Sequence, residues 1–190
     1  MLYYKTLVSI NNFKIIRWPD IKKDVENELI VKCQQGNLEA YKMIYEMHST
    51  MLYSIAMRML NSKEDAEDVL QNAFIRLFNN IKNFRFQAKF SSYLTRILIN
   101  CCYDHLNKKK SNHQEIDENV LRAESQDELS LSLEKAIGLL PLKMRECFIL
   151  FAVEGFKQKE IADTMEISEG TVKAHISQAK AKLRKMLGEI

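Results

Sequence analysis

The regular spacing of apolar residues is the feature that most constrains the fold of this chain. Between residues 24 and 187, apolar side chains recur every three or four positions, with one interruption after residue 110. Such spacing places them on one face of successive α-helices. Glycine and proline occur only five times and twice in 190 residues, which disfavours the many turns of an all-β fold. The sequence therefore predicts an all-α protein.

The interruption divides the helical pattern into two blocks. Residues 111–134 hold one basic and seven acidic side chains, a net charge of −6, whereas the flanking blocks are net positive. Within this segment, residues 111–127 are polar with weak periodicity, which is typical of a linker. We therefore expect two small helical domains, at 24–110 and 128–190, joined by a flexible acidic linker at 111–127. Residues 1–23 form an extension of unknown role, and a strand-like arm, a disordered tail and a misplaced start all fit their composition.

The cysteines and the hydropathy narrow the class of protein. Cys33, Cys101, Cys102 and Cys147 lie within apolar helical patterns and form no CxxC pair. We expect reduced, buried thiols rather than disulfides or a zinc site. No apolar run approaches the ~20 residues of a membrane span, and polar residues interrupt any signal-peptide core near the start. These features favour a cytoplasmic protein without membrane insertion.

The chain lacks the short motifs of common enzyme families. It has no P-loop, GxGxxG, HExxH or Ser/His/Asp signature. The only pattern that suggests catalysis is the acidic cluster of Glu64, Asp65, Glu67 and Asp68. These residues crowd the first turns of a predicted helix, where the helix dipole favours negative charge, so we interpret them as surface charge. We expect no enzymatic activity, no catalytic residue, no metal and no cofactor.

The stretch KQKEIADTMEISEGTVKAHISQAKAKLRKML, residues 157–187, has the pattern of a helix-turn-helix. KQKEIADTM predicts the first helix, EIS the turn, and the remainder a second helix capped by Ser168. The N-terminal half of the second helix enters the major groove in such motifs, where Gln178 would pair with adenine. A plain two-helix hairpin within a bundle is the alternative. The residues expected to contact DNA are Lys157, Lys159, Thr171, Lys173, Ala174, His175, Ser177, Gln178 and Lys180.

A predicted helix that begins after Ser62 has two apolar stripes. One stripe, which should face the core, comprises Ala66, Val69, Leu70, Ala73, Leu77 and Ile81. Phe74 and Phe78 fall beside it, although a helix buried on one side has no need of them there. Either another helix covers these two rings or they form an interaction surface. The pattern alone leaves both interpretations open.

Aromatic and cationic side chains alternate in the segment that precedes the next helix. The order is Phe84, Arg85, Phe86, Gln87, Lys89 and Phe90. A helix from about residue 92 to 107 follows, capped by Ser91 or Ser92, and ends in Lys108–Lys110. Rings stack on bases and cations meet phosphates, so this combination favours nucleic-acid binding. The alternative is an aromatic edge of the core beside a solvated basic helix end.

Three motifs, in this order, resemble the bacterial RNA polymerase sigma factors of the extracytoplasmic-function (ECF) group. DAEDVLQNAFIRLF is similar to the polymerase-binding helix of that family. FRFQAKFSSYLTRILINCCYDHLNKKK is similar to its promoter-melting loop and minus-ten recognition helix. LPLKMRECFILFAVEGFKQKEIADTMEISEGTVKAHISQAKAKL is similar to its minus-thirty-five domain. The resemblance spans about residues 24–187 and leaves residues 1–23 uncovered.

The resemblance implies an RNA polymerase sigma factor, which confers promoter recognition and promoter melting in transcription initiation. It assigns polymerase docking to the helix after Ser62. The matching residues there are Asp65, Asp68, Gln71, Asn72, Phe74, Ile75 and Phe78. The residues that match the loop and helix acting on the minus-ten element are Arg85, Phe86, Gln87, Lys89, Phe90, Tyr93, Arg96, Asn100, Lys108, Lys109 and Lys110.

The implied partners are promoter DNA, an anti-sigma factor and core RNA polymerase, through the clamp helices of its largest subunit and the flap of the second-largest. The chain departs from the family at several of these positions. The family usually has tryptophan where Tyr93 stands; tyrosine still stacks, so we expect promoter melting to be weaker but not lost. Glycine is common at the position of Phe86, so we expect a loop of different shape. Arginines are frequent where His175, Gln178 and Lys180 stand. Arginine reads guanine whereas glutamine prefers adenine, which bears on the minus-thirty-five preference.

A transcription regulator is the alternative function. It would bind DNA through residues 128–187 alone and use residues 24–110 for sensing or dimerisation. That reading leaves Phe74, Phe78 and the aromatic loop without a purpose. The two-block layout also suggests that the isolated chain hides its DNA surfaces by packing its two domains together.

Overall fold

A computed structural model of the chain describes residues 23–112 and 133–187 and leaves residues 1–22, 113–132 and 188–190 undescribed. Every regular element in the described ranges is a helix. In chain order the elements are α1 (Lys23–Gln34), α2 (Leu38–Leu60), α3 (Lys63–Asn80), the 3₁₀ turn η2 (Ile81–Asn83), α4 (Phe90–Asn112), α5 (Leu133–Gly138), α6 (Leu142–Phe148), the π-helical turn η4 (Ile149–Val153), α7 (Gln158–Met165) and α8 (Glu169–Leu187). The prediction of an all-α fold is confirmed. Apart from a few helical positions at their ends, the N-terminal extension and the acidic linker lie outside the described residues.

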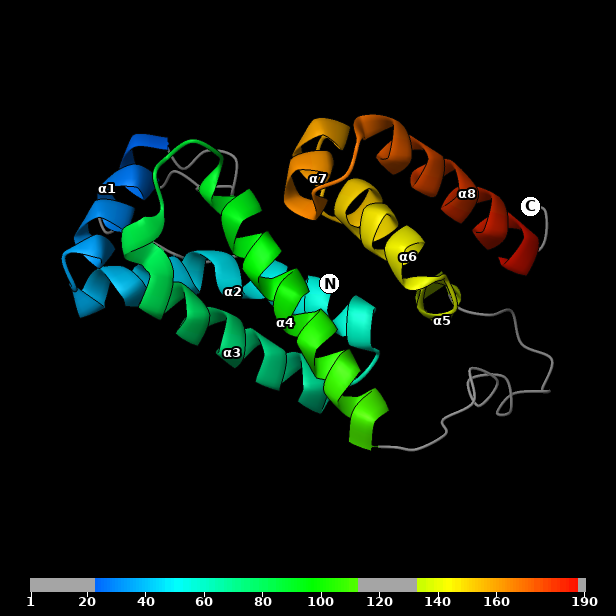
Figure 1. Cartoon of the computed structure of the whole chain (residues 1–190), viewed down its shortest axis with the longest axis horizontal. Coiled ribbons are helices and arrows are strands. Elements are labelled where there is room, and N and C mark those ends of the chain that lie inside the picture. Colours follow the sequence, from blue (N-terminus) through cyan, green and yellow to red (C-terminus); the bar gives the residue numbers. More distant parts are fainter. Residues whose placement is uncertain (1–22, 113–132, 188–190) are drawn as a thin grey trace, which may run out of the picture.

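The N-terminal domain consists of α1 to α4. Helix α2 packs against α1, α3 and α4, and α3 and α4 lie side by side (Figure 1). Its largest fully buried side chains are Ile30, Ile44, Leu52, Ile55, Met59, Leu77, Ile81, Leu94 and Leu98. Each such side chain contributes about 2 kcal/mol when it leaves water. His48 lies in this core as expected, where its Nε2 is 3.1 Å from a carboxylate oxygen of Glu26.

Helix α3 begins and packs as its sequence predicts. The Ser62 hydroxyl accepts a hydrogen bond from the backbone N–H of Asp65 at 3.3 Å, which caps the helix. Asn61, immediately before it, adopts a left-handed conformation with φ of 53° and ends α2. The stripe expected to face the core is buried: Ala66, Val69, Leu70, Ala73, Leu77 and Ile81.

Helix α4 begins earlier and ends later than its sequence predicts. Its first residue is Phe90, and the N–H of Tyr93 already donates to the carbonyl of Lys89 at 3.1 Å. The expectation that Ser91 or Ser92 caps this helix is therefore wrong. Phe90 is only 3% exposed, and its burial draws the start of the helix towards the core. At the other end, the helix runs to Asn112, so the lysines at 108–110 lie on it rather than after it.

The C-terminal domain consists of α5 to α8. Helix α6 continues into η4, and Gly155, with φ of 73°, ends the run. Helices α7 and α8 are separated by residues 166–168, the turn expected for a helix-turn-helix. The Ser168 hydroxyl accepts a hydrogen bond from the N–H of Thr171 at 3.0 Å, so the predicted cap of the second helix is confirmed. The stripe Val172, Ile176, Ala179 and Leu183 is buried against α6 and α7.

The two domains pack against each other. Helix α2 contacts α5 and α6, and α4 contacts α7 (Figure 1). The four cysteines are buried free thiols, as expected. Within the described ranges, no group of histidine, cysteine and acidic side chains could hold a metal ion. No described helix is both long enough and apolar enough to cross a membrane.

Candidate DNA-binding and polymerase-binding surfaces

Four aromatic rings form a cluster between η2 and the first turn of α4. Phe84 lies at its centre, with ring centroids 5.0 Å from Phe86, 5.3 Å from Phe90 and 5.0 Å from Tyr93. Gln34 of α1 anchors the segment, since its side-chain amide donates to the carbonyl of Phe84 at 2.9 Å. The cluster fixes the backbone of the loop while it leaves Phe86 42% exposed.

Phe86 adopts a left-handed backbone conformation. Its φ of 57° is a value that side chains other than glycine rarely take, at a cost of about 1 kcal/mol. Glycine adopts such a conformation without a steric cost. In this conformation Phe86 presents an exposed aromatic ring at the tip of the loop, where a glycine would have no side chain.

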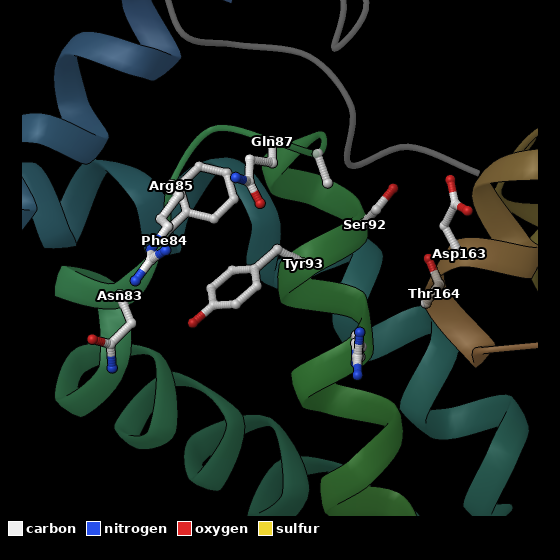
Figure 2. Close-up of a pocket in the computed structure, with 10 residues that line it drawn as sticks. Asn83, Phe84, Arg85, Gln87, Ser92, Tyr93, Asp163 and Thr164 are labelled. Carbon is white, nitrogen blue, oxygen red and sulfur yellow. The ribbon is translucent and has the colours of Figure 1, made fainter.

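A cavity of about 240 Å³ opens beside this loop. It is lined by Asn83, Phe84, Arg85, Gln87, Ala88, Ser92, Tyr93, Arg96, Asp163 and Thr164. Figure 2 shows the Tyr93 ring projecting into the space between the loop and α4, with Asp163 and Thr164 on α7 at the far side. Burial raises the pKa of Tyr93, so its hydroxyl stays neutral. The cavity combines one aromatic wall with several hydrogen-bonding groups.

The residues predicted to meet the minus-ten element divide into exposed and buried ones. Arg85, Phe86, Gln87, Lys89, Arg96, Asn100, Lys108 and Lys109 are exposed, and Tyr93 is half-buried. Phe90 is the exception, because it packs against Phe84 and His48 within the core. Its predicted contact with DNA is therefore wrong, and its position supports the loop from below. Lys110 lies on α4, and nothing is described of its side chain.

Two of the exposed cations pair with acidic residues of the C-terminal domain, Glu160 on α7 and Glu166 at the cap that follows it. The Lys89 ammonium lies 2.5 Å from a carboxylate oxygen of Glu160, and Arg96 pairs with Glu166. Burial alone would raise the pKa of Glu160, but hydrogen bonds from Lys89 and from the N–H of Lys157 lower it overall. Glu160 is therefore a carboxylate that bridges the two domains.

The sequence left open whether another helix covers Phe74 and Phe78 or whether these rings form an interaction surface. In the structure of α3, each interpretation holds in part. Two tyrosines of α2 cover one side of the rings, with centroids 4.7 Å apart for Tyr45 and Phe74 and 4.6 Å apart for Tyr41 and Phe78. Phe78 is nevertheless 50% exposed, and its neighbour Ile75 is 57% exposed. Asp68, Gln71 and Asn72 are also exposed. An apolar patch with polar neighbours therefore remains open.

Asp65, near the start of α3, is paired within the chain. Its carboxylate is 3.0 Å from Nε2 of His105 and 2.5 Å from Nζ of Lys109, both on α4. Burial alone would raise its pKa, but hydrogen bonds from Lys109 and Ser62 and the charge of His105 lower it overall. Asp65 thus ties α3 to α4, a contact that the sequence interpretation of this residue as a docking group did not anticipate. Its side chain is only 15% exposed.

The outward face of α8 presents short and polar side chains. Lys173, Ala174, Ser177 and Gln178 are exposed, as are Lys157 and Lys159 near α7, whereas Thr171 and His175 are half-buried. Lys180 lies over the ring of Phe151, 5.2 Å from its centroid, so part of its charge already has an internal partner. The exposed residues form a continuous strip along the first half of the helix, which suits the major groove.

Comparison with known families explains this combination of surfaces. Residues 44–112 match Sigma-70 region 2, and residues 130–183 match Sigma-70, region 4. The ECF RNA polymerase sigma factor SigW of Bacillus subtilis is 30% identical over 179 residues, which cover 85% of this chain and 96% of that protein. The ECF RNA polymerase sigma factor SigM of Mycobacterium tuberculosis is 29% identical over 164 residues, covering 85% and 84%.

Solved structures share the fold. CnrH in complex with the cytosolic domain of CnrY has a TM-score of 0.67 at 22% identity, over 86% of this chain and 97% of that chain. The sigma factor RpoE in complex with the anti-sigma factor NepR, from Bartonella quintana, has a TM-score of 0.61 at 22% identity, over 87% and 98%. The two matched regions define a protein of the sigma-70 class. Within that class, the chain belongs to the ECF RNA polymerase sigma factors and acts in transcription initiation.

Sequence reasoning missed two groups of residues around these surfaces. Tyr41 and Tyr45 border the α3 patch, and their spacing of four on α2, which puts both on one face of that helix, is the signal that could have found them. The acidic residues of α7 were not singled out, because only the folded chain brings them to the cations of α4.

Proposed function

We propose that this sigma factor divides promoter recognition among three surfaces. The outer face of α3 binds core polymerase, the loop before α4 opens the minus-ten element, and the outward face of α8 reads the minus-thirty-five element. The observation that carries the proposal is the aromatic cavity at Tyr93 with exposed cations around it. The corresponding division of the chain is an extension at 1–23, a region 2 domain at 24–110, a linker at 111–127 and a region 4 domain at 128–190.

The α3 patch is proposed to dock on the clamp helices of the largest polymerase subunit. Ile75 and Phe78 supply the apolar centre of the patch. The polar side chains of Asp68, Gln71 and Asn72 surround it and would fix the register of the contact. An apolar centre with a polar rim is the usual anatomy of a protein interface. Phe74 supports the patch from below, and Asp65 holds α3 against α4. The flap of the second-largest subunit is the proposed partner of the C-terminal domain.

The loop before α4 is proposed to capture one base of the non-template strand. Removing a base from the stack costs a few kcal/mol, which stacking and hydrogen bonds in a fitted pocket must recover. Tyr93 supplies a ring in the cavity, Arg85 and Gln87 supply donors, and the exposed ring of Phe86 can stack on a neighbouring base. Lys89, Arg96, Asn100 and the lysines at 108–110 would hold phosphates.

The outward face of α8 is proposed to lie in the major groove. Gln178 has the geometry to pair bidentately with adenine, and Ser177 can meet several base edges. Lys157, Lys159, Lys173 and Lys180 would contact phosphates, which position the helix without reading sequence. Thr171, Ala174 and His175 complete the face that meets the groove.

The solved structure of CnrH contains the cytosolic domain of CnrY, and that of RpoE contains the anti-sigma factor NepR. By that likeness, an anti-sigma factor is proposed to regulate this chain as well. The chain itself would perform no catalysis and require no cofactor, since polymerase supplies the chemistry. We place it in the cytoplasm, where polymerase and promoter DNA are.

Transcription from purified components tests the proposal. The chain is mixed with bacterial core polymerase and fragmented genomic DNA from its source, and the 5′ ends of the transcripts are sequenced. Discrete start sites that share two upstream elements support the division of labour. Phe78→Ala should weaken binding to core polymerase by about tenfold, as expected for one interface anchor, while Lys82→Ala, an exposed residue outside the patch, should not. Equal binding by both variants would contradict the α3 assignment.

A further inference from the structure

Gln34, the last residue of α1, bonds to the start of the loop that precedes α4. Its side-chain amide donates to the carbonyl of Ile81 at 3.0 Å and to the carbonyl of Phe84 at 2.9 Å. Both distances are ordinary for N–H···O hydrogen bonds. The two carbonyls lie at the first residue of η2 and at the residue that caps it. Helix α1, which packs against η2 (Figure 1), therefore holds the base of the loop directly.

The backbone that carries Gln34 is fixed by the way α1 ends. Gly36 has a φ of 86°, and its N–H donates to the carbonyl of Cys33 at 2.9 Å. The N–H of Asn37 donates to the carbonyl of Lys32 at 3.0 Å. These two bonds form a Schellman motif, which ends a helix in a defined geometry. Gln34 thus projects from a well-defined helix end towards η2.

The two bonds require the chemistry of a primary amide. Carbonyl oxygens only accept hydrogen bonds, and the amide nitrogen of glutamine carries two N–H donors, one for each carbonyl. The carbonyl of Ile81 also accepts from the backbone N–H of Phe84 at 3.0 Å, so the amide and the turn share this acceptor. A glutamate of the same shape would turn an oxygen towards both carbonyls and donate to neither. Gln34→Glu therefore removes both bonds with almost no change of volume.

The loop beyond Phe84 depends on its two ends for its position. Residues 85–88 are exposed and form no backbone–backbone hydrogen bond with another residue that the structure describes. The rings of Phe84 and Phe90 are buried at the two ends of the segment. Gln34 adds the backbone bond at the first end, next to Arg85 and Gln87, which line the cavity (Figure 2).

We propose that Gln34 is a positioning residue for promoter melting, and that its two hydrogen bonds hold the loop in the shape that receives the captured base. The inference rests on the proposed function of the loop. Gln34 is not among the residues that line the cavity, so it acts through the loop and not by contact with the base. A loop ordered in advance binds more tightly than one that DNA must order, because less entropy is lost on binding.

The effect of Gln34 should be confined to one of the three proposed surfaces. The patch at Phe78 lies on α3, and the proposed reading face lies on α8. Gln34 bonds to neither helix through its side chain, since both printed partners are carbonyls of η2 and its cap. Substitution of Gln34 should therefore leave binding to core polymerase and to a minus-thirty-five duplex unchanged.

Binding of forked promoter DNA by the complex of this chain with core polymerase tests the proposal. The probe is a promoter found by the transcription experiment above, with its non-template strand left single-stranded through the minus-ten element. A series of probes carries an abasic site at each position of that strand in turn. For the unsubstituted chain, the abasic site that weakens binding most marks the captured base. Fluorescence anisotropy measures each affinity.

Gln34→Glu should weaken binding to the intact fork about tenfold, as expected for the loss of two ordinary hydrogen bonds. On the fork that lacks the captured base, the variant and the parent chain should bind equally, because the capture that Gln34 supports no longer contributes. A merely structural role would weaken binding to both probes alike. Gln34→Met, which has neither charge nor donor, should give the same pattern and serves as the test if the glutamate variant fails to fold.

The matched control is Gln35→Glu, which adds the same charge one residue later at an exposed side chain. It should leave both affinities unchanged. Equal weakening by Gln35→Glu would overturn the proposal, because the added charge alone would then explain the effect. Weakening by Gln34→Glu to the same degree on both probes would overturn it as well.

The abasic series separates failure of this inference from failure of the proposed function. If no abasic site weakens binding by the unsubstituted chain, the loop captures no base, and the proposed function of the loop is refuted together with the role of Gln34. If one abasic site does weaken binding but both Gln34 variants bind the intact fork as the parent does, only the positioning role is refuted.

Discussion

The two proposed DNA-binding surfaces of this sigma factor differ in how they are built. The proposed reading face of α8 is one side of one helix, and its exposed residues lie within a few positions of each other in sequence. The proposed minus-ten surface is assembled from η2, a strained loop and α4, and Asp163 and Thr164 of α7 line its cavity. The first surface is local and open, whereas the second depends on tertiary contacts for both its shape and its accessibility.

The difference predicts that core substitutions disable one surface without the other. Phe84→Ala removes the ring at the centre of the aromatic cluster, and Phe84 is only 7% exposed. We expect a loss of about 3 kcal/mol of unfolding free energy, as for other buried phenylalanines, together with loss of promoter opening. Denaturant unfolding and permanganate reactivity of the minus-ten element measure the two effects.

Two observations would control for general damage by Phe84→Ala. A promoter with a pre-opened minus-ten bubble should restore part of the initiation, and binding to a minus-thirty-five duplex should persist. Loss of duplex binding to the same degree as loss of opening would show that the two surfaces are not independent.

A converse substitution acts on α8 alone. Gln178→Ala should weaken binding to a minus-thirty-five duplex by about tenfold where the element presents adenine to Gln178, the value of one bidentate base contact. Opening of a promoter that is already bound should not change. Fluorescence anisotropy with a set of duplexes that differ at one base pair measures the effect, with Lys185→Ala as a control at an exposed position farther along α8. Equal weakening on every duplex would indicate a phosphate contact instead.

A substitution at the loop tip should have smaller effects, and it should change stability and the rate of promoter opening in opposite directions. Phe86→Gly relieves the left-handed strain, which should stabilise the fold by about 1 kcal/mol, less the entropy that glycine loses on folding. Because the exposed ring is lost as well, promoter opening should become slower. Thermal unfolding and open-complex kinetics measure the pair of effects. Ala88→Gly, in the same loop without a positive φ, should lower stability; a gain there equal to that of Phe86→Gly would refute the strain argument.

The interface should respond weakly to pH through Glu146. Burial raises the pKa of this carboxyl, although Tyr103 and Lys143 oppose the shift. With the two domains packed, Glu146 therefore keeps a proton that it releases when they separate, so the packing becomes less stable as pH rises above the ordinary glutamate value of 4.5. Glu146→Gln should flatten this dependence when small-angle scattering follows the size of the free chain across pH.

Tyr103→Phe provides the matched variant for that titration. It removes the hydroxyl that lowers the pKa of Glu146, so the pH dependence should extend to higher pH rather than disappear. If the pH dependence is unchanged in Glu146→Gln, another group controls it. Glu154 is then the candidate, since burial raises its pKa too.

Residues whose role depends on local sequence were predicted correctly. The caps at Ser62 and Ser168, the buried stripe of α3 and the turn at 166–168 all follow from periodicity and capping within one or two helical turns. Their hydrogen bonds join residues three positions apart, so the information is contained in the segment itself.

Contacts between residues that lie far apart in the chain were not predicted. Phe90 belongs to an aromatic segment in which exposed and buried rings cannot be distinguished by pattern, and only packing against His48 and Phe84 buried it. The bond between Asp65 and Lys109, 44 positions away, was not predicted either. Lys89 meets Glu160, an acid in the other domain.

The sequence by itself determined the helices and their order, because the spacing of apolar residues within short segments specifies them. The charge pattern divided the chain into two net positive helical blocks around an acidic segment, and three motifs carried the resemblance to the sigma-factor family. The tertiary structure decided which aromatic rings are exposed, how the loop at Phe86 is strained, and that Glu160 of α7 pairs with Lys89 beside that loop. These outcomes depend on packing and charge pairing between residues far apart in the chain, and no periodicity encodes such pairs.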